Sequence, residues 1–222
     1  LAAMGADPAP ERASPGYVAA LFDQVADEFE LTLVHSLGYM LPSAMAAKFA
    51  ELGLGPFPRA LDLGCGTGLA GEALADVVEH MTGVDLAGKM LEVAAEKEVY
   101  RELHRGDAVA FLEGVEEAPY DLIVATDVMP YLGDLSAILD GMRRCIAPGG
   151  IVSFSTETLK DEDFGGADYV VGARHRFAHR PAPLREALEA RGFTLLTMDL
   201  VALRFESGRP VPGLLVIARA AA

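Results

Sequence analysis

Hydrophobic residues recur at helical spacing near the start of the chain and later form short runs that alternate with helical stretches. The first helical pattern begins at Tyr17, and its apolar positions continue to Phe29 at steps of three or four residues. A second helix is predicted over 42–52, before the Gly and Pro residues of 53–58 interrupt the pattern. Beyond this break the pattern predicts strands at 60–63, 81–85, 100–104, 121–126 and 151–155, and helices at 69–77, 88–97 and 135–146.

The C-terminal part of the chain has a different pattern. A short helix is predicted over 184–191, followed by strands at 193–205 and 214–218 that are joined by a turn at 207–210. Strands with so short a connection pair antiparallel, whereas strands that alternate with helices form a parallel, doubly wound sheet. We therefore predict an α/β fold with a mostly parallel sheet of seven strands, closed by a C-terminal antiparallel hairpin.

Three segments follow from these patterns. Residues 1–16, rich in Ala and Pro, are expected to form a tail or linker, and residues 17–55 an N-terminal helical lid. The α/β domain is expected to occupy residues 56–222. The chain starts at Leu1 rather than Met, so we expect that the natural sequence extends further upstream.

Composition narrows the partners and the compartment. The formal net charge of −15 disfavours nucleic acid and anionic membrane surfaces. No stretch approaches the roughly 20 apolar residues of a membrane span. The two cysteines, Cys65 and Cys145, are too few for a disulfide framework and lack metal-ligand spacing, which favours the cytoplasm and predicts no metal site. The oligomeric state is left open.

The strongest chemical signal is the segment 61–68, Leu-Asp-Leu-Gly-Cys-Gly-Thr-Gly, where an apolar strand leads into three alternating glycines. Glycine allows positive φ and a close ligand approach, and the following helix offers free N–H groups. Gly66, Gly68 and Gly71 also satisfy G-x-G-x-x-G, which leaves a dinucleotide site as an alternative. However, Asp62 would bring a negative charge close to a pyrophosphate.

Acidic residues at three further strand ends are candidates for the same crevice. Asp85 ends the strand 81–85, where a carboxylate can accept both hydroxyls of a ribose or cap the next helix. Asp107, followed by Ala108, can accept an adenine amino group or act as an N-cap. Thr126 and Asp127 lie at the end of the strand 121–126, where reacting groups are expected because strand ends line the crevice of open α/β sheets.

Together these residues resemble the class I S-adenosylmethionine (SAM)-dependent methyltransferases, whose first motif is similar to LDLGCGTG at 61–68. Asp85, Asp107 and the turn 148–150 fall where that family's pattern places them. The resemblance implies a Rossmann-like fold, with SAM as cofactor and S-adenosylhomocysteine (SAH) as product. A narrower likeness, carried by 17–42, 68–74, 127–135 and 209–219, is to bacterial methyltransferases attached to tetratricopeptide repeats. Met40-Leu41 departs from these relatives, which tend to have Arg-Ala.

The resemblance also assigns roles in cofactor binding. The loop of Gly64, Cys65, Gly66 and Gly68, with Leu63 before it, would pass under the methionine part of SAM. Asp62 would help to hold the amino group. Asp85 would bind the ribose, Leu86 and Met90 would pack on the adenine, and Asp107 and Ala108 would meet the adenine edge. Thr126 and Asp127 would lie beside the methyl donor, and Phe29 and Tyr39 would cover the cofactor.

The residues that meet the acceptor are less clearly marked. His175 is the candidate general base, because histidine titrates near neutrality, and Tyr131 could orient a substrate hydroxyl. For His179 a structural role, such as capping the next helix, is the stronger expectation. The chain lacks the Asn/Asp-Pro-Pro-Tyr/Phe motif of amino-group methylation, which favours an oxygen, carbon or sulfur acceptor on a small molecule. The alternatives are an NAD(P)-binding oxidoreductase, a non-catalytic SAM-binding module and a protein methyltransferase.

Overall fold

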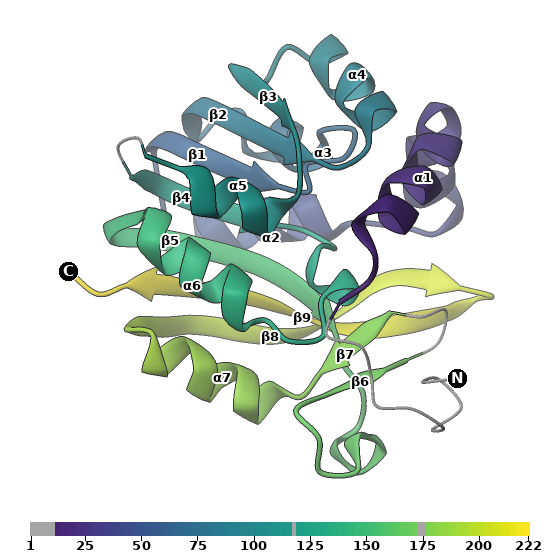
Figure 1. Ribbon diagram of the computed structural model, residues 1–222, viewed down its shortest axis with the longest axis vertical. Helices are drawn as coiled ribbons and strands as arrows, with labels where there is room; N and C mark the ends of the chain where they lie inside the picture. The colour runs from purple at the N-terminus through teal and green to yellow at the C-terminus, as the bar shows by residue number, and fades with distance from the viewer. Residues whose placement is uncertain (1–11, 117–118, 173–175) are drawn as a thin grey trace.

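A central sheet organises the protein in the computed structural model, which describes residues 12–116, 119–172 and 176–222 (Figure 1). In these residues the sheet has nine strands, which run in the order β3-β2-β1-β4-β5-β7-β6, with β9 paired to β5 and β8 paired to β9. The strands are β1 Phe57–Leu63, β2 Val78–Asp85, β3 Glu102–Arg105, β4 Tyr120–Ala125, β5 Ile146–Glu157, β6 Tyr169–Val171, β7 Phe177–His179, β8 Phe193–Glu206 and β9 Arg209–Ala220.

Strand direction confirms the predicted fold class. Strands β3, β2, β1, β4 and β5 pair parallel, and β9 then runs antiparallel to both β5 and β8. The crossover from β1 to β2 goes one way along the sheet and that from β4 to β5 goes the other. The order in which successive strands are added therefore reverses between β1 and β4. Ligands of doubly wound sheets bind at such a point.

Helices cover both faces of the sheet (Figure 1). On one face lie α5, α6 and α7, and on the other lie α2 and α3, while α1 and α4 pack together beside the carboxyl ends of the strands. The bounds are α1 Pro15–Val25, α2 Leu41–Glu51, α3 Leu69–Leu74, α4 Gly88–Glu96, α5 Ala108–Gly114, α6 Ser136–Cys145 and α7 Pro181–Ala190. No helix of the described residues is long and apolar enough to cross a membrane.

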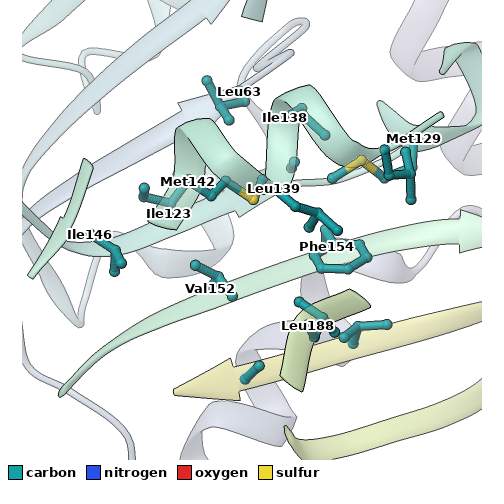
Figure 2. Close-up of a cluster of buried hydrophobic side chains, with 14 of the residues drawn as sticks. Leu63, Ile123, Met129, Ile138, Leu139, Met142, Ile146, Val152, Phe154 and Leu188 are labelled. Atoms are coloured by element: carbon teal, nitrogen blue, oxygen red, sulfur yellow. The ribbon is translucent and has the colours of Figure 1, made fainter. Parts of the chain in front are cut away.

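Two hydrophobic clusters hold these layers together. In β4, Ile123 faces α6, whereas its neighbours Leu122 and Val124 face α2 and α3, as the alternation of a strand requires. Figure 2 shows the first cluster, in which Leu139 and Met142 of α6 pack over Ile123 and the neighbouring strand. The apolar run predicted as a doubly covered strand is therefore the centre of the core.

Three regions in and beside the sheet differ from the sequence prediction. The sheet has nine strands rather than seven, because 169–179, predicted as loop-rich, forms the three-residue strands β6 and β7. Strands so short carry no readable alternation. The prediction also lacked α5, which Asp107 caps by accepting a hydrogen bond from the Ala110 N–H. The strand expected from 100 begins at Glu102, since Tyr100 packs under the glycine loop.

The N-terminal region is more broken than predicted. Helix α1 starts at Pro15 rather than Tyr17 and stops at Val25, and a 3-10 turn and the π-helical segment Leu31–Ser36 follow. Residues at the end of the expected tail are also structured. The Ala13 N–H donates to the Tyr131 carbonyl, and Arg12 forms a bridge with Leu132. The N-terminal segment therefore lies across the carboxyl ends of the strands.

Candidate active site

A cavity of about 190 Å³ opens at the carboxyl ends of β1, β2 and β4, where the sheet reverses direction. Its floor is the loop after β1, and its roof comes from the N-terminal helices. Most of the predicted site residues line it: Phe29, Tyr39, Gly64, Cys65, Gly66, Asp85, Leu86, Asp107, Ala108, Thr126, Asp127 and Tyr131. The fold thus brings together, around one cavity, predicted residues from seven separate segments of the chain.

The glycine loop depends on glycine for two different reasons. Gly64, Gly66 and Gly68 all have positive φ, of 67°, 53° and 91°. A Cβ at Gly64 would overlap the Val128 side chain, so the loop can approach the end of β4 only without one. A Cβ at Gly66 would meet no atom within 4 Å, because this residue borders the cavity. The loop therefore leaves open space that a ligand can fill.

Asp85 ties the loop to the next strand. Its carboxylate accepts a hydrogen bond from the Gly66 N–H at 2.9 Å and another from the Ala87 N–H at 2.8 Å. Burial raises the pKa of Asp85, and these backbone donors oppose that effect. Each carboxylate oxygen can accept further bonds, so the side chain can hold the loop and still bind a ligand hydroxyl.

Asp62 lies behind the loop and does not line the cavity. It is fully buried, one oxygen accepts a hydrogen bond from the Tyr100 hydroxyl at 2.7 Å, and the other has no partner. Burial raises the pKa of Asp62 to about 7, with the Tyr100 bond opposing it. A Cβ at Gly71 would approach the Tyr100 ring to 2.7 Å. The third glycine of G-x-G-x-x-G is therefore explained by packing against Tyr100, and no pyrophosphate is needed to account for it.

Asp107 fills one of the two roles that the sequence left open and also forms an ion pair. One oxygen caps α5, and the other forms an ion pair with Arg12. Since Arg12 also lines the cavity, the N-terminal segment meets the carboxylate at the place assigned to the adenine edge. The capping interpretation is confirmed, while adenine binding stays a prediction.

Asp127 has an unusual backbone, and one of its carboxylate oxygens has no partner among the described residues. Its φ of 58° lies in the left-handed region, and its N–H donates to the Ser155 hydroxyl at 2.9 Å. Its Oδ1 is buried without a hydrogen-bond partner, although Asp127 lines the cavity. Burial raises the pKa of Asp127, and the charges of Arg204 and Arg176 lower it. Strain and an unsatisfied carboxylate at one residue are features of a functional position.

Aromatic side chains form the roof and one wall. Phe22 makes edge contacts with Phe29 and Tyr131, with ring centroids 5.9 and 5.7 Å apart. Tyr39 is buried, and this burial raises the pKa of its hydroxyl well above the usual value. These rings come from the N-terminal helices, from the connection before α2 and from the 3-10 helix Met129–Tyr131, so the predicted lid residues do face the cavity.

Besides Asp62, three predicted cofactor residues do not line the cavity, and neither does His179. Leu63 belongs to the core, Gly68 packs against Tyr100, and Met90 is buried behind the cavity with Ala26 and Ala87. His175 lies outside the described residues. His179 is in β7, where it bonds to the Thr156 hydroxyl at 2.5 Å and the Gly133 carbonyl at 3.0 Å. Its structural role is confirmed, but the helix cap is Arg180, so the expected capping by His179 is wrong.

Sequence reasoning missed a buried ion cluster on the far side of the cavity. Arg204 of β8 donates from Nε to Glu206 at 2.8 Å and from NH2 to Glu157 at 2.5 Å. Arg176 reaches the same Glu157 oxygen at 3.4 Å, and its guanidinium lies over the Tyr131 ring, 5.7 Å from the centroid. The signal that could have shown it is an arginine flanked by apolar residues in a predicted strand.

Comparison with known proteins supports this geometry. A family model described as a methyltransferase domain matches residues 38–198. A ubiquinone biosynthesis O-methyltransferase of Maricaulis maris is 31% identical, with 72% of this chain and 68% of the relative covered. The protein of the same name from Xylella fastidiosa is 32% identical, with 68% and 66% covered.

Solved structures share the fold at low identity. The DhpI complex with SAH aligns with a TM-score of 0.66 at 20% identity, over 93% of this chain and 97% of DhpI. A SAM-dependent methyltransferase from Clostridium acetobutylicum aligns with a TM-score of 0.64 at 16% identity, over 91% and 100%. The family match and the two relatives define the class as SAM-dependent methyltransferase, and the shared fold agrees with it. By the family match, the chain belongs to the methyltransferase-domain family, and the nicotinamide alternative loses its support.

Proposed function

We propose that this enzyme transfers the methyl group of SAM to an oxygen atom of a small molecule. The observation that carries the proposal is the crevice itself, in which an open glycine loop, the Asp85 carboxylate and an aromatic roof surround one cavity. Oxygen is favoured as acceptor because two relatives at 31% and 32% identity are O-methyltransferases. The absence of the amino-group methylation motif after β4 agrees with this choice.

The adenosine half of SAM is assigned to the side of β2 and β3. Asp85 would bind the ribose hydroxyls with the lone pairs that Gly66 and Ala87 leave free. Leu86 would pack on the adenine, with Met90 supporting it from behind. Asp107 and Ala108 would meet the adenine edge, which requires that the Arg12 side chain yield or share the carboxylate.

The methionine half is assigned to the loop Gly64–Gly68. Thr126 and Asp127 border it from β4, and Phe29 and Tyr39 cover it from the N-terminal helices. Asp62 would act from behind the loop, where its free oxygen can bind the amino group through water. We propose the segment 17–55 as the lid of this site, held down by Lys97, which pairs with Glu30 at 2.6 Å and with Glu72.

Bound SAM supplies a methyl group that its sulfonium already activates. The chain's task is to align the acceptor with this group and to exclude water, which the aromatic roof can do. An oxygen acceptor starts protonated, so a base is needed. Asp127 is the described residue best placed to take this proton, because its Oδ1 has no partner and burial raises its pKa. Tyr131 would orient the acceptor hydroxyl, and His175 stays a second candidate base.

Calorimetric titration with SAM, SAH and NAD tests the cofactor assignment. Wild type should bind SAM and SAH but not NAD, and Asp85→Ala should lose most of this binding because two backbone anchors and the ribose contact disappear together. Asp76→Ala, which changes an exposed carboxylate beyond α3, is the control. A screen of small hydroxylated compounds and of peptides with labelled SAM then tests the acceptor class. Labelled peptides without labelled small molecules would favour a protein methyltransferase.

Two wider assignments belong to the same proposal. The likeness at 17–42 and 209–219 supports tetratricopeptide repeats upstream of this chain, which sequencing of the genomic region around Leu1 tests. Both cysteines are buried and unpaired, which supports a reducing compartment such as the cytoplasm.

A further inference from the structure

The ion cluster at the end of β8 contains a guanidinium nitrogen that has no partner in the described part of the chain: no residue there forms a hydrogen bond with it. Arg204 is only 2% exposed, and its Nε and NH2 bond to Glu206 and Glu157. Its NH1 is buried and has no hydrogen-bond partner, although Arg204 lines the cavity. An unsatisfied nitrogen of a buried cation is costly, and a ligand oxygen would remove that cost.

An irregularity in the pairing of β8 turns the Arg204 side chain toward the interior. The pairing of β8 with β9 shifts by one residue between Ala202 and Arg204, so Leu203 is the extra residue of a β-bulge. Regular alternation would bury one of Leu203 and Arg204 and expose the other, but both are buried. Bulges re-aim side chains in this way and recur next to active sites.

The neighbouring carboxylates hold the Arg204 guanidinium in place but do not form hydrogen bonds with all of its N–H groups. Glu157 accepts from Arg204 and also pairs with Arg176 at 3.4 Å, so one carboxylate holds two cations beside the cavity. The guanidinium of Arg204 carries N–H groups on two sides. On one side Nε and NH2 bond to Glu206 and Glu157, and NH1 lies on the other side. Such a charged donor binds carboxylate or ionised hydroxyl oxygens more strongly than neutral ones.

Sheet topology separates this group from the cofactor side. The candidate cofactor residues follow β1, β2, β3 and β4, whereas β8 lies beyond β5 and β9 in the sheet. Asp127, which we propose to lie beside the methyl group, stands between the two sides. The charge of Arg204 lowers the pKa of Asp127. The Arg204 guanidinium, on the side of Asp127 away from the candidate cofactor residues, therefore faces the acceptor.

We propose that NH1 of Arg204 binds a carboxylate of the methyl acceptor, so that the acceptor is a small molecule that carries a carboxylate in addition to the oxygen to be methylated. This inference rests on the proposed function. The same chemistry could instead come from the carboxylate of SAM, and the experiment distinguishes the two sources.

The probes are 3,4-dihydroxybenzoate and 3,4-dihydroxybenzamide, which share their hydroxyls and differ in one negative charge. Each is titrated calorimetrically into the full chain loaded with SAH. Wild type should bind the benzoate at least about tenfold more tightly than the benzamide, as a charge-assisted bond provides. In Arg204→Met combined with Glu157→Gln, which leaves no carboxylate unpaired at Glu157, the preference should vanish while SAH affinity is kept. Arg209→Met, an exposed arginine on the same hairpin, is the matched control.

Three results would overturn the inference. Wild type could show no preference for the benzoate, or the preference could survive in the double variant. Alternatively, the double variant could lose affinity for SAH but not for 5′-methylthioadenosine, which lacks the amino-acid part, and this would assign Arg204 to the cofactor. Failure of wild type to bind SAH at all would refute the proposed function instead, so the two failures are distinguishable.

Discussion

Replacing Gly66 by alanine separates the strain of the loop from the space that a ligand needs. Gly66 has a φ of 53°, and a Cβ there would meet no atom of the protein within 4 Å. The folded state should therefore lose only the cost of a left-handed alanine, about 1–2 kcal/mol of unfolding free energy. The new methyl group would stand beside the cavity where we place the methionine part of SAM. Crowding of this kind costs about 1–3 kcal/mol, which weakens SAH binding by about 5- to 150-fold.

Gly149 provides the matched control for this experiment. It has a φ of 75°, its Cβ would also meet no atom within 4 Å, and it lies in the turn of β5, away from the cavity. Gly149→Ala should lose about the same stability, 1–2 kcal/mol, and bind SAH like wild type. Urea unfolding measures the stability and calorimetry the affinity. If Gly66→Ala bound SAH as tightly as wild type, the loop could not be the cofactor cradle. If both variants lost affinity equally, strain rather than contact would explain the result.

Three further substitutions test the buried charges. Asp62 has a native pKa of about 7, above its unfolded value of about 4, so the unfolding free energy should fall as pH rises through that window; Asp62→Asn should remove this slope in urea titrations at several pH values. Burial lowers the pKa of His179 to about 4, so its contribution should be lost as pH falls below about 6.5, and the gap between wild type and His179→Gln should shrink there; a constant gap would contradict the neutral histidine. Asp127→Gly should raise the unfolding free energy by about 1 kcal/mol, because it removes left-handed strain and an unpartnered carboxylate, while methyl transfer is lost; a less stable variant that keeps its activity would contradict both assignments.

The residues that we assign to the cofactor could be predicted from the sequence because their signals are local. The loop 61–68 needs glycine at particular φ values. Asp85 ends a predicted strand and Asp107 follows another. Parallel strands then bring these ends to one edge without further information. Even the alternative roles of Asp107 were readable, since capping and ligand binding demand the same short carboxylate.

The residues that we assign to the acceptor were not predicted, because their placement depends on contacts between distant segments. Arg204 is inside only because a bulge at Leu203 breaks the alternation of β8, and a single sequence does not mark such a bulge. Its partner Glu157 lies 47 residues away, at the end of β5, which the pattern predicted to stop at 155. Strands β6 and β7 are similarly set by pairing with β5 and with each other rather than by their own residues.

The distribution of unsatisfied polar atoms links the two sides. Thr67 Oγ1, Asp127 Oδ1 and Arg204 NH1 are all buried without a partner, and all three residues line the same cavity. Each such atom costs the folded protein about 1–3 kcal/mol, so evenly scattered orphans would be hard to explain. Ser153 Oγ, within the sheet itself, also lacks a hydrogen-bond partner, which shows that burial alone can leave a polar atom unsatisfied. Three around one cavity, an acceptor, a hydroxyl and a cationic donor, instead match a site whose hydrogen bonds are completed by polar ligands. The cationic donor among them is the one that calls for a negatively charged partner.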